Sequence, residues 1–158
     1  MDNQPQYQPL PDSWREVRAE WRGETAFFGR NPSGGVVEIG SDQGKPALSP
    51  MELLLAGLAG CTGADVASIM EKKRQPLQRF EITVRGKRAD NHPKVFKEIE
   101  VMYYLWGENL EPRSVEQAIQ LSEEKYCSAS AMLGSVARIR SSYRILSPGE
   151  EFRLEETG

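Results

Sequence analysis

Hydrophobic and polar positions alternate in three short runs near the N-terminus. The runs cover Glu16 to Arg22, Thr25 to Arg30 and Gly35 to Gly40, and turn-forming residues separate them. A period of two is typical of strands that are buried on one face. Gly, Asn, Pro and Ser between such runs favour tight turns. The pattern therefore predicts a three-stranded meander.

After Leu48 the hydrophobic period becomes that of a helix. Ser49-Pro50-Met51-Glu52 combines a serine N-cap, a proline in the first turn and a glutamate that completes a capping box. The helical pattern runs to Lys72-Lys73-Arg74, whose positive charges suit a helix C-terminus, and Pro76 follows. We expect one long helix that begins at Pro50 and ends near Arg74.

Beyond this helix the period of two returns. Phe80 to Val84 and Ile99 to Leu105 alternate, and the polar segment Asp90 to Pro93 lies between them. Such a pair of runs around a turn predicts a long hairpin.

Two more helices and a last strand complete the pattern. Ser114 to Gln117 has the form of a second capping box, Ala129 to Val136 continues as a short helix, and Arg138 to Leu146 ends the fold as a strand. The order βββ-α-ββ-α-α-β predicts an α+β fold rather than a doubly wound parallel sheet.

Composition separates one folded segment from two ends. Residues 1–13 are rich in proline and glutamine, so we expect a mobile N-terminal arm, and residues 148–158 form an acidic tail. Residues 14–147 then make a single domain, which suits a chain of 158 residues.

Charge and residue counts exclude several classes of function. The net charge of -3 gives no strong attraction to nucleic acid, and a single histidine excludes a histidine-rich zinc site. We expect no metal and no cofactor. The uninterrupted apolar run Leu53 to Ala64 is shorter than the roughly 20 residues that span a bilayer. With no secretory signal pattern at the N-terminus, the sequence predicts a cytoplasmic protein without a membrane anchor.

A stripe of small residues follows one side of the first helix: Ala56, Gly60, Gly63 and Ala67. Glycine inside a helix costs roughly 0.5–1 kcal/mol relative to alanine, so close packing should compensate. We expect a helix that is buried all round, against a sheet and a second helix. That second helix is either the same helix of a symmetry-related copy or the chain's own Ala129 to Val136 helix.

The chain has two cysteines, Cys61 and Cys127, too far apart for a C-x-x-C motif. In a reducing compartment such cysteines are more often reactive or incidental than a permanent bridge. Cys127 near a helix start should ionise more readily than Cys61, which lies mid-helix and needs a nearby cation. The alternative is that Cys61 is an inert, buried residue.

The segments around these cysteines are distinctive. Ser49 to Val66 and Ser122 to Ser128 resemble the OsmC/Ohr family of osmotically inducible and organic hydroperoxide resistance proteins, and the likeness in element order covers residues 15–146. The resemblance implies an OsmC-like fold in an intertwined homodimer. In such a dimer the cysteine-bearing helices are central and buried, and the N-terminal strands join the partner's sheet.

The resemblance also implies thiol-dependent reduction of organic hydroperoxides. Cys61 would become a sulfenic acid and Cys127 would resolve it as a disulfide, which a dithiol such as a lipoyl group would reduce. Met51, Leu54 and Leu58 would provide apolar walls for the organic substrate.

The chain departs from the family pattern at the residues that assist the thiolate. In the family's peroxidases an arginine from an N-terminal strand holds the thiolate, and a glutamate ten positions before the first cysteine orients that arginine. Met51 occupies that position here, and Glu52 follows it. We expect Arg22 to be the arginine, with Arg18 and Arg30 as alternatives. Glu52 is either a catalytic acid or only the second half of the capping box.

Three hypotheses follow. The first is a cysteine-based organic hydroperoxide reductase. The second, favoured by Met51, is a redox-responsive or apolar-ligand-binding dimer that turns over little substrate. The third is a structural protein whose thiols are inert.

Overall fold

The computed structural model describes residues 9–40 and 46–152 of the chain. The chain divides into two compact units, residues 1–53 and 54–158. The expected arm and tail, residues 1–13 and 148–158, fall partly outside the described residues.

The first unit contains an antiparallel sheet in the order β1-β2-β3. Its strands are β1 (Arg18–Gly23), β2 (Ala26–Arg30) and β3 (Val36–Ile39). The predicted meander is therefore confirmed, with ends that differ by one or two residues. Gly40 follows β3 with a φ of 75°, and a Cβ there would lie 2.5 Å from the Thr25 carbonyl oxygen, so this exit from the sheet requires glycine.

Helix α1 (Pro50–Lys72) starts as the sequence predicts. The Ser49 N–H donates to Glu52 Oε2 at 2.7 Å, and the Glu52 N–H donates to Ser49 Oγ at 3.2 Å, which is a reciprocal capping box. The helix ends two residues before the predicted Arg74, because Arg74 adopts a left-handed φ of 54°.

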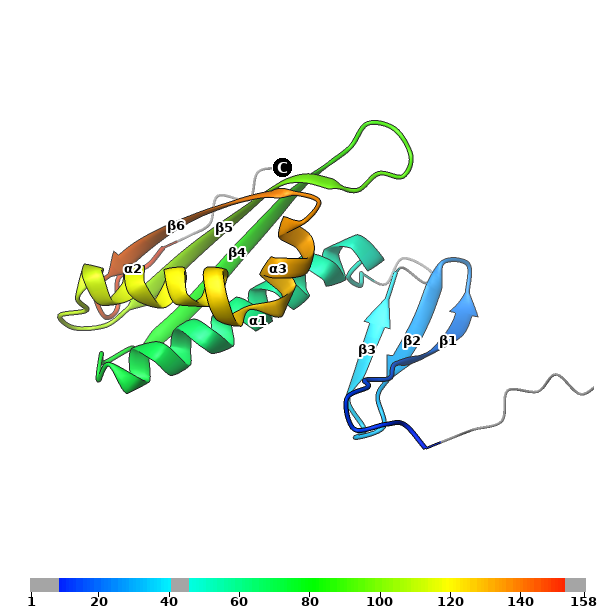
Figure 1. Ribbon diagram of the computed structural model, residues 1–158, viewed down its shortest axis with the longest axis horizontal. Helices are drawn as coiled ribbons and strands as arrows, with labels where there is room; N and C mark the ends of the chain where they lie inside the picture. The colour runs from blue at the N-terminus through cyan, green and yellow to red at the C-terminus, as the bar shows by residue number, and fades with distance from the viewer. Residues whose placement is uncertain (1–8, 41–45, 153–158) are drawn as a thin grey trace, which may run out of the picture. The chain divides into compact units, whose positions relative to one another are not determined.

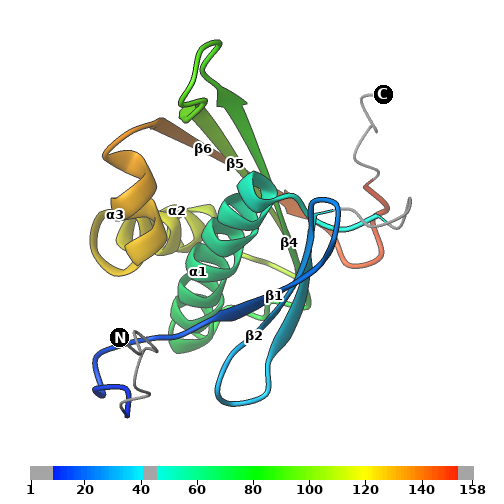
Figure 2. The same cartoon turned by 90° about the vertical axis from the view of Figure 1, so that its right-hand side faces the viewer.

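The second unit is built on a sheet in the order β4-β5-β6. Strand β5 (Phe96–Trp106) pairs antiparallel with β4 (Arg79–Arg88) and parallel with β6 (Arg138–Leu146). Helices α1 and α2 lie on the same face of this sheet (Figure 1, Figure 2). The core between the helices and the sheet contains fully buried side chains from α1 and β5: Leu58, Val66, Met70, Ile99, Tyr103 and Leu105.

Three helical segments connect β5 to β6. They are α2 (Pro112–Leu121), the π-helix η1 (Ser122–Tyr126) and α3 (Ser128–Gly134). The predicted capping box at Ser114 is wrong, because the helix starts earlier, with Pro112 in its first turn and Glu111 as N-cap. The Ser114 hydroxyl instead donates to Glu111 Oε2 at 2.8 Å. The sequence pattern did not predict η1. The α+β prediction and the order of the other elements are confirmed.

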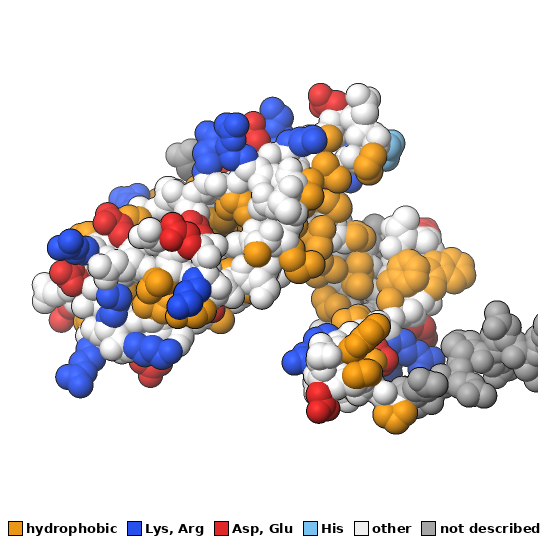
Figure 3. Space-filling model, viewed as in Figure 1, with side chains coloured by type: hydrophobic (Ala, Val, Ile, Leu, Met, Phe, Trp, Pro, Cys, Tyr) orange, Lys and Arg blue, Asp and Glu red, His pale blue; other side chains and the backbone are white. Residues whose placement is uncertain are grey.

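One side of α1 is not covered in the described chain. Its buried residues are Leu58, Thr62, Val66 and Met70. The small residues Ala56, Gly60 and Ala67 are exposed in the described single chain, so the alternative that the chain's own Ala129 to Val136 helix covers them is wrong. Burial of this side by the same helix of a symmetry-related copy stays a prediction. The sheet can bury only the side that faces it. Hydrophobic side chains gather over the N-terminal part of α1 (Figure 3).

Helix α1 is also long and apolar enough, by length and composition alone, to cross a membrane. The uninterrupted apolar run ends at Glu52 and Asp65, but the apolar pattern resumes beyond Asp65, from Val66 to Met70. Core helices of soluble proteins pass the same test.

Candidate active site

The structure brings the two cysteines together in the second unit. Cys61 lies in the middle of α1 and is half-buried, whereas Cys127 lies between η1 and α3 and is buried. Both thiols are free, and Cys61 is near enough to raise the pKa of the Cys127 thiol. Two segments that are remote in the sequence therefore place their cysteines near each other.

The environment of Cys127 keeps its thiol protonated. Burial raises the pKa of Cys127, a hydrogen bond from Ser130 lowers it, and the neighbouring Cys61 raises it. The net pKa lies above the ordinary value, so the expectation that the helix start makes Cys127 easy to ionise is not met. The Ser130 N–H does donate to Cys127 Sγ at 3.3 Å, but desolvation outweighs this bond.

A chain of buried hydroxyl groups lies beside the cysteines. Thr62, the residue after Cys61, makes hydrogen bonds to Tyr103 Oη at 2.8 Å and to Ser122 Oγ at 2.9 Å. The Ser122 hydroxyl donates to Asp65 Oδ2 at 2.9 Å. Burial raises the pKa of Tyr103 to about 12, and the Glu123 carboxylate and Cys127 add to this effect. These hydrogen bonds link α1, β5 and η1 around the cysteine pair.

Thr62, Tyr103 and Ser122 were not predicted from the sequence as part of this site. Thr62 and Ser122 lie inside the two cysteine segments, so their positions were a signal that could have identified them. Tyr103 was assigned only to an alternating strand, and its partner Thr62 is 41 positions away.

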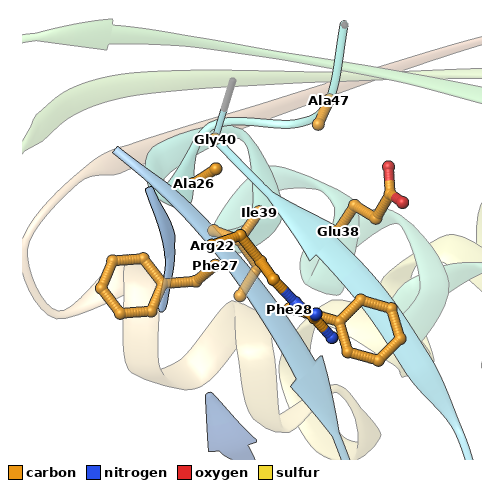
Figure 4. Close-up of a pocket in the computed structure, with 8 residues that line it drawn as sticks. All are labelled: Arg22, Ala26, Phe27, Phe28, Glu38, Ile39, Gly40 and Ala47. Atoms are coloured by element: carbon orange, nitrogen blue, oxygen red, sulfur yellow. The ribbon is translucent and has the colours of Figure 1, made fainter. Parts of the chain in front are cut away.

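Arg22 lies in the first unit, in a pocket of about 320 Å³ whose walls come from β1, β2, β3 and the segment after them (Figure 4). Its guanidinium is 5.1 Å from the centre of the Phe28 ring and 3.7 Å from a Glu20 carboxylate oxygen. Arg30 makes similar contacts with Phe28 and Glu20. Because the cysteines belong to the second unit, a contact between Cys61 and Arg22, Arg18 or Arg30 stays a prediction.

The remaining predicted site residues lie along the first turns of α1. The Glu52 carboxylate accepts hydrogen bonds from the Ser49 backbone and side chain, which lower the pKa of Glu52. Met51 is half-buried and Leu54 is 47% exposed, so both have accessible surface. Leu58 is fully buried and forms part of the core instead.

Within residues 9–40 and 46–152 there is no group of three or more His, Cys, Asp or Glu side chains that could hold a metal ion.

Comparisons with known proteins show which family this chain resembles. Residues 40–142 match the family model described as OsmC-like protein. The chain is 33% identical over 132 residues to Protein YhfA of Escherichia coli, which spans 84% of this chain and 98% of that protein. A hypothetical protein from Aquifex aeolicus VF5 is 37% identical and has a TM-score of 0.77, over 87% of this chain and 98% of that chain. The organic hydroperoxide resistance protein OhrB of Bacillus subtilis shares the fold, with a TM-score of 0.58 at 18% identity over 83% and 98% of the two chains.

Proposed function

Because the chain belongs to the OsmC-like protein family, we propose that it is a thiol-dependent peroxidase that reduces organic hydroperoxides. The observation that carries this proposal is the proximity of Cys61 and Cys127, which come from α1 and from the junction of η1 and α3. OhrB, which shares the fold, is named for organic hydroperoxide resistance.

The reaction begins at Cys61. Its thiolate attacks the terminal oxygen of the hydroperoxide, an S–O bond forms and the O–O bond breaks. The sulfur gives up two electrons and becomes a sulfenic acid, and the departing alkoxide takes a proton and leaves as an alcohol.

Cys127 completes the oxidation. Its sulfur attacks the Cys61 sulfur, the S–O bond breaks, and the hydroxide leaves as water with the proton of the Cys127 thiol. A dithiol of the lipoyl type then reduces the disulfide by thiol–disulfide exchange and is itself oxidised to a disulfide. A cytoplasmic location fits this requirement for a reducing partner.

A homodimer would complete the site. In this proposal the first unit of each chain joins the partner's sheet, and Arg22 keeps the Cys61 thiolate ionised. The exposed side of α1 supports such a dimer, since Ala56, Gly60 and Ala67 permit close approach of a second backbone. Met51 and Leu54 would then contact the alkyl part of the substrate.

The test is the reaction of the reduced protein with tert-butyl hydroperoxide. We expect one intramolecular Cys61–Cys127 disulfide by mass spectrometry and steady turnover when dihydrolipoamide is present. Cys61→Ser should abolish both. Cys127→Ser should form a sulfenic acid that dimedone traps, without a disulfide. A protein that stays fully reduced under excess hydroperoxide would refute the proposal.

A second function is favoured by a specific observation. Met51 replaces the family's acid and Glu52 is engaged in the helix cap, so the assistance to the thiolate is weaker than in the family's peroxidases. In this alternative the dimer binds a small apolar ligand or responds to oxidation without steady turnover. A stoichiometric burst of disulfide with no dithiol consumption afterwards would favour it over the enzyme.

A further inference from the structure

Ser122 is hydrogen-bonded to both cysteine-bearing segments. It is the first residue of η1 and is fully buried, whereas Lys125 and Tyr126 of the same π-helix are exposed. Resting on the proposed redox role of the two thiols, we propose that Ser122 is the positioning residue that sets the separation of the Cys61 and Cys127 sulfur atoms.

The side chain of Ser122 holds α1. Its hydroxyl is 2.9 Å from Thr62 Oγ1, on the residue that follows Cys61, and 2.9 Å from Asp65 Oδ2, one helical turn after Cys61. Both partners belong to the turns of α1 that carry the first cysteine. A shift of η1 relative to this part of α1 would break a buried hydrogen bond to Thr62 and a partly buried one to the Asp65 carboxylate.

The backbone of Ser122 holds Cys127. The Cys127 N–H donates to the Ser122 carbonyl at 2.7 Å, which closes the π-helical turn before the second cysteine. A regular α-helix would bond this carbonyl to the residue before Cys127. The wider turn therefore bonds the backbone of Cys127 to Ser122, whose side chain also bonds to the helix that carries Cys61.

The direction of the hydrogen bonds is fixed by their end point. A carboxylate only accepts hydrogen bonds, so the Ser122 hydroxyl donates its one hydrogen to Asp65. Ser122 Oγ must then accept a hydrogen bond from the Thr62 hydroxyl. Thr62 in turn accepts from the Tyr103 hydroxyl. A hydrogen bond to a charged group is stronger than one between neutral groups. At the other end of this series of hydrogen bonds, Tyr103 belongs to β5.

This arrangement has a chemical consequence. Disulfide formation needs the two sulfur atoms near each other before reaction, and such preorganisation raises their effective concentration. Without the Ser122 hydroxyl, η1 and α1 lose their direct side-chain link, and the Cys127 sulfur samples positions farther from Cys61. Ser122→Ala should therefore lower the tendency to form the disulfide while both cysteines remain present.

The experiment measures the equilibrium between the full-length protein and mixtures of reduced and oxidised dithiothreitol. In it the two thiols are oxidised to the disulfide as oxidised dithiothreitol is reduced, so no hydroperoxide is needed. Ser122→Ala should lower the equilibrium constant about tenfold, the loss expected for one hydrogen bond to a charged group. Ser114→Ala is the matched control, because Ser114 is also buried and donates to a carboxylate, Glu111, within α2.

Thr62→Val removes one of the two bonds of this link from the α1 side, leaves the bond between Ser122 and Asp65 in place, and provides a second test if Ser122→Ala folds poorly. Each single variant should lower the equilibrium constant, Thr62→Val by less, and the double variant should fall little below Ser122→Ala, because that variant already lacks the bond to Thr62. Equal constants for wild type and Ser122→Ala, or purely additive losses, would overturn the proposal. Failure of the wild type to form the disulfide in this buffer would also overturn it. A disulfide that forms here but not with hydroperoxide would instead count against the peroxidase alone.

Discussion

At the scale of single residues, burial determines the protonation of the Cys127 thiol. Cys127 is 3% exposed and its pKa is raised, so it keeps its proton at neutral pH. A protonated, buried thiol is a poor attacking group for a peroxide. In the proposed reaction it would still act as the resolving thiol, because the oxidised Cys61 sulfur would lie near it. Half-buried Cys61 is the cysteine that a substrate can reach.

Tyr103 provides a test of the hydroxyl chain through pH. Its pKa is raised to about 12 from the ordinary 10, so between these values the unfolded chain loses this proton and the folded chain keeps it. Folding stability should therefore fall as pH rises above 10. Tyr103→Phe should cost about 1 kcal/mol at neutral pH, for the lost hydrogen bond to Thr62.

Urea unfolding at several pH values measures both effects. The free energy of unfolding of Tyr103→Phe should fall less steeply above pH 10 than that of the wild type, and the two curves should converge. Tyr143 also has a raised pKa, but it contributes equally to both proteins. Parallel curves would show that Tyr103 does not carry the effect.

At the scale of elements, the π-helix controls where Cys127 lies. A π-turn is an α-helical turn with one extra residue, and such turns often occur at functional sites. Deletion of exposed Lys125 should return η1 to α-helical geometry and rotate the following residue by about 100°. We expect the deletion variant to keep its helical circular dichroism and to form no Cys61–Cys127 disulfide with tert-butyl hydroperoxide. Lys125→Ala, which preserves the chain length, should react like the wild type.

The capping box separates the two roles considered for Glu52. Glutamine also completes a capping box, so Glu52→Gln should leave stability and the rate of hydroperoxide reaction nearly unchanged. Ser49→Ala should destabilise the protein by about 1 kcal/mol, the typical value for a lost N-cap. Stopped-flow rates with tert-butyl hydroperoxide and urea unfolding measure these effects. A large loss of rate in Glu52→Gln, with stability intact, would assign the carboxylate to catalysis.

The sign of the pH effect at Glu52 follows from its lowered pKa. The carboxylate form is favoured in the folded chain, so its contribution to stability is present above the unfolded value of 4.5 and is lost as pH falls below it. Glu52→Gln removes this dependence, because an amide does not titrate in this range.

Local patterns predicted most elements correctly, and the errors have local causes. Strand β6 starts and ends at the predicted residues, and the Ser49 cap starts α1, because both depend on residues close in sequence. The capping box predicted at Ser114 was wrong because the helix begins earlier, at Pro112. The spacing of apolar residues in the sequence did not indicate the π-helix. The bond between Thr62 and Ser122 joins residues 60 positions apart, so only the tertiary structure reveals it.

At the scale of the whole molecule, the topology explains why remote cysteines meet. Strands β5 and β6 are parallel, so the chain between them must cross a face of the sheet. Helices α2 and α3 make this crossing on the face that α1 occupies (Figure 1, Figure 2). The crossing returns Cys127 to the side of the sheet where Cys61 lies.

The homodimer can be tested by complementation between inactive variants. If Arg22 acts on the Cys61 of the partner chain, Cys61→Ser and Arg22→Ala homodimers should each be inactive. After unfolding and refolding together, mixed dimers contain one site with an intact Cys61 from one chain and an intact Arg22 from the other. Peroxidase activity with dihydrolipoamide should then reappear. If Arg22 acts within its own chain, every site in the mixed dimer lacks one of the two residues, and the mixture should stay inactive. Co-refolding two Cys61→Ser preparations controls for recovery during the procedure itself.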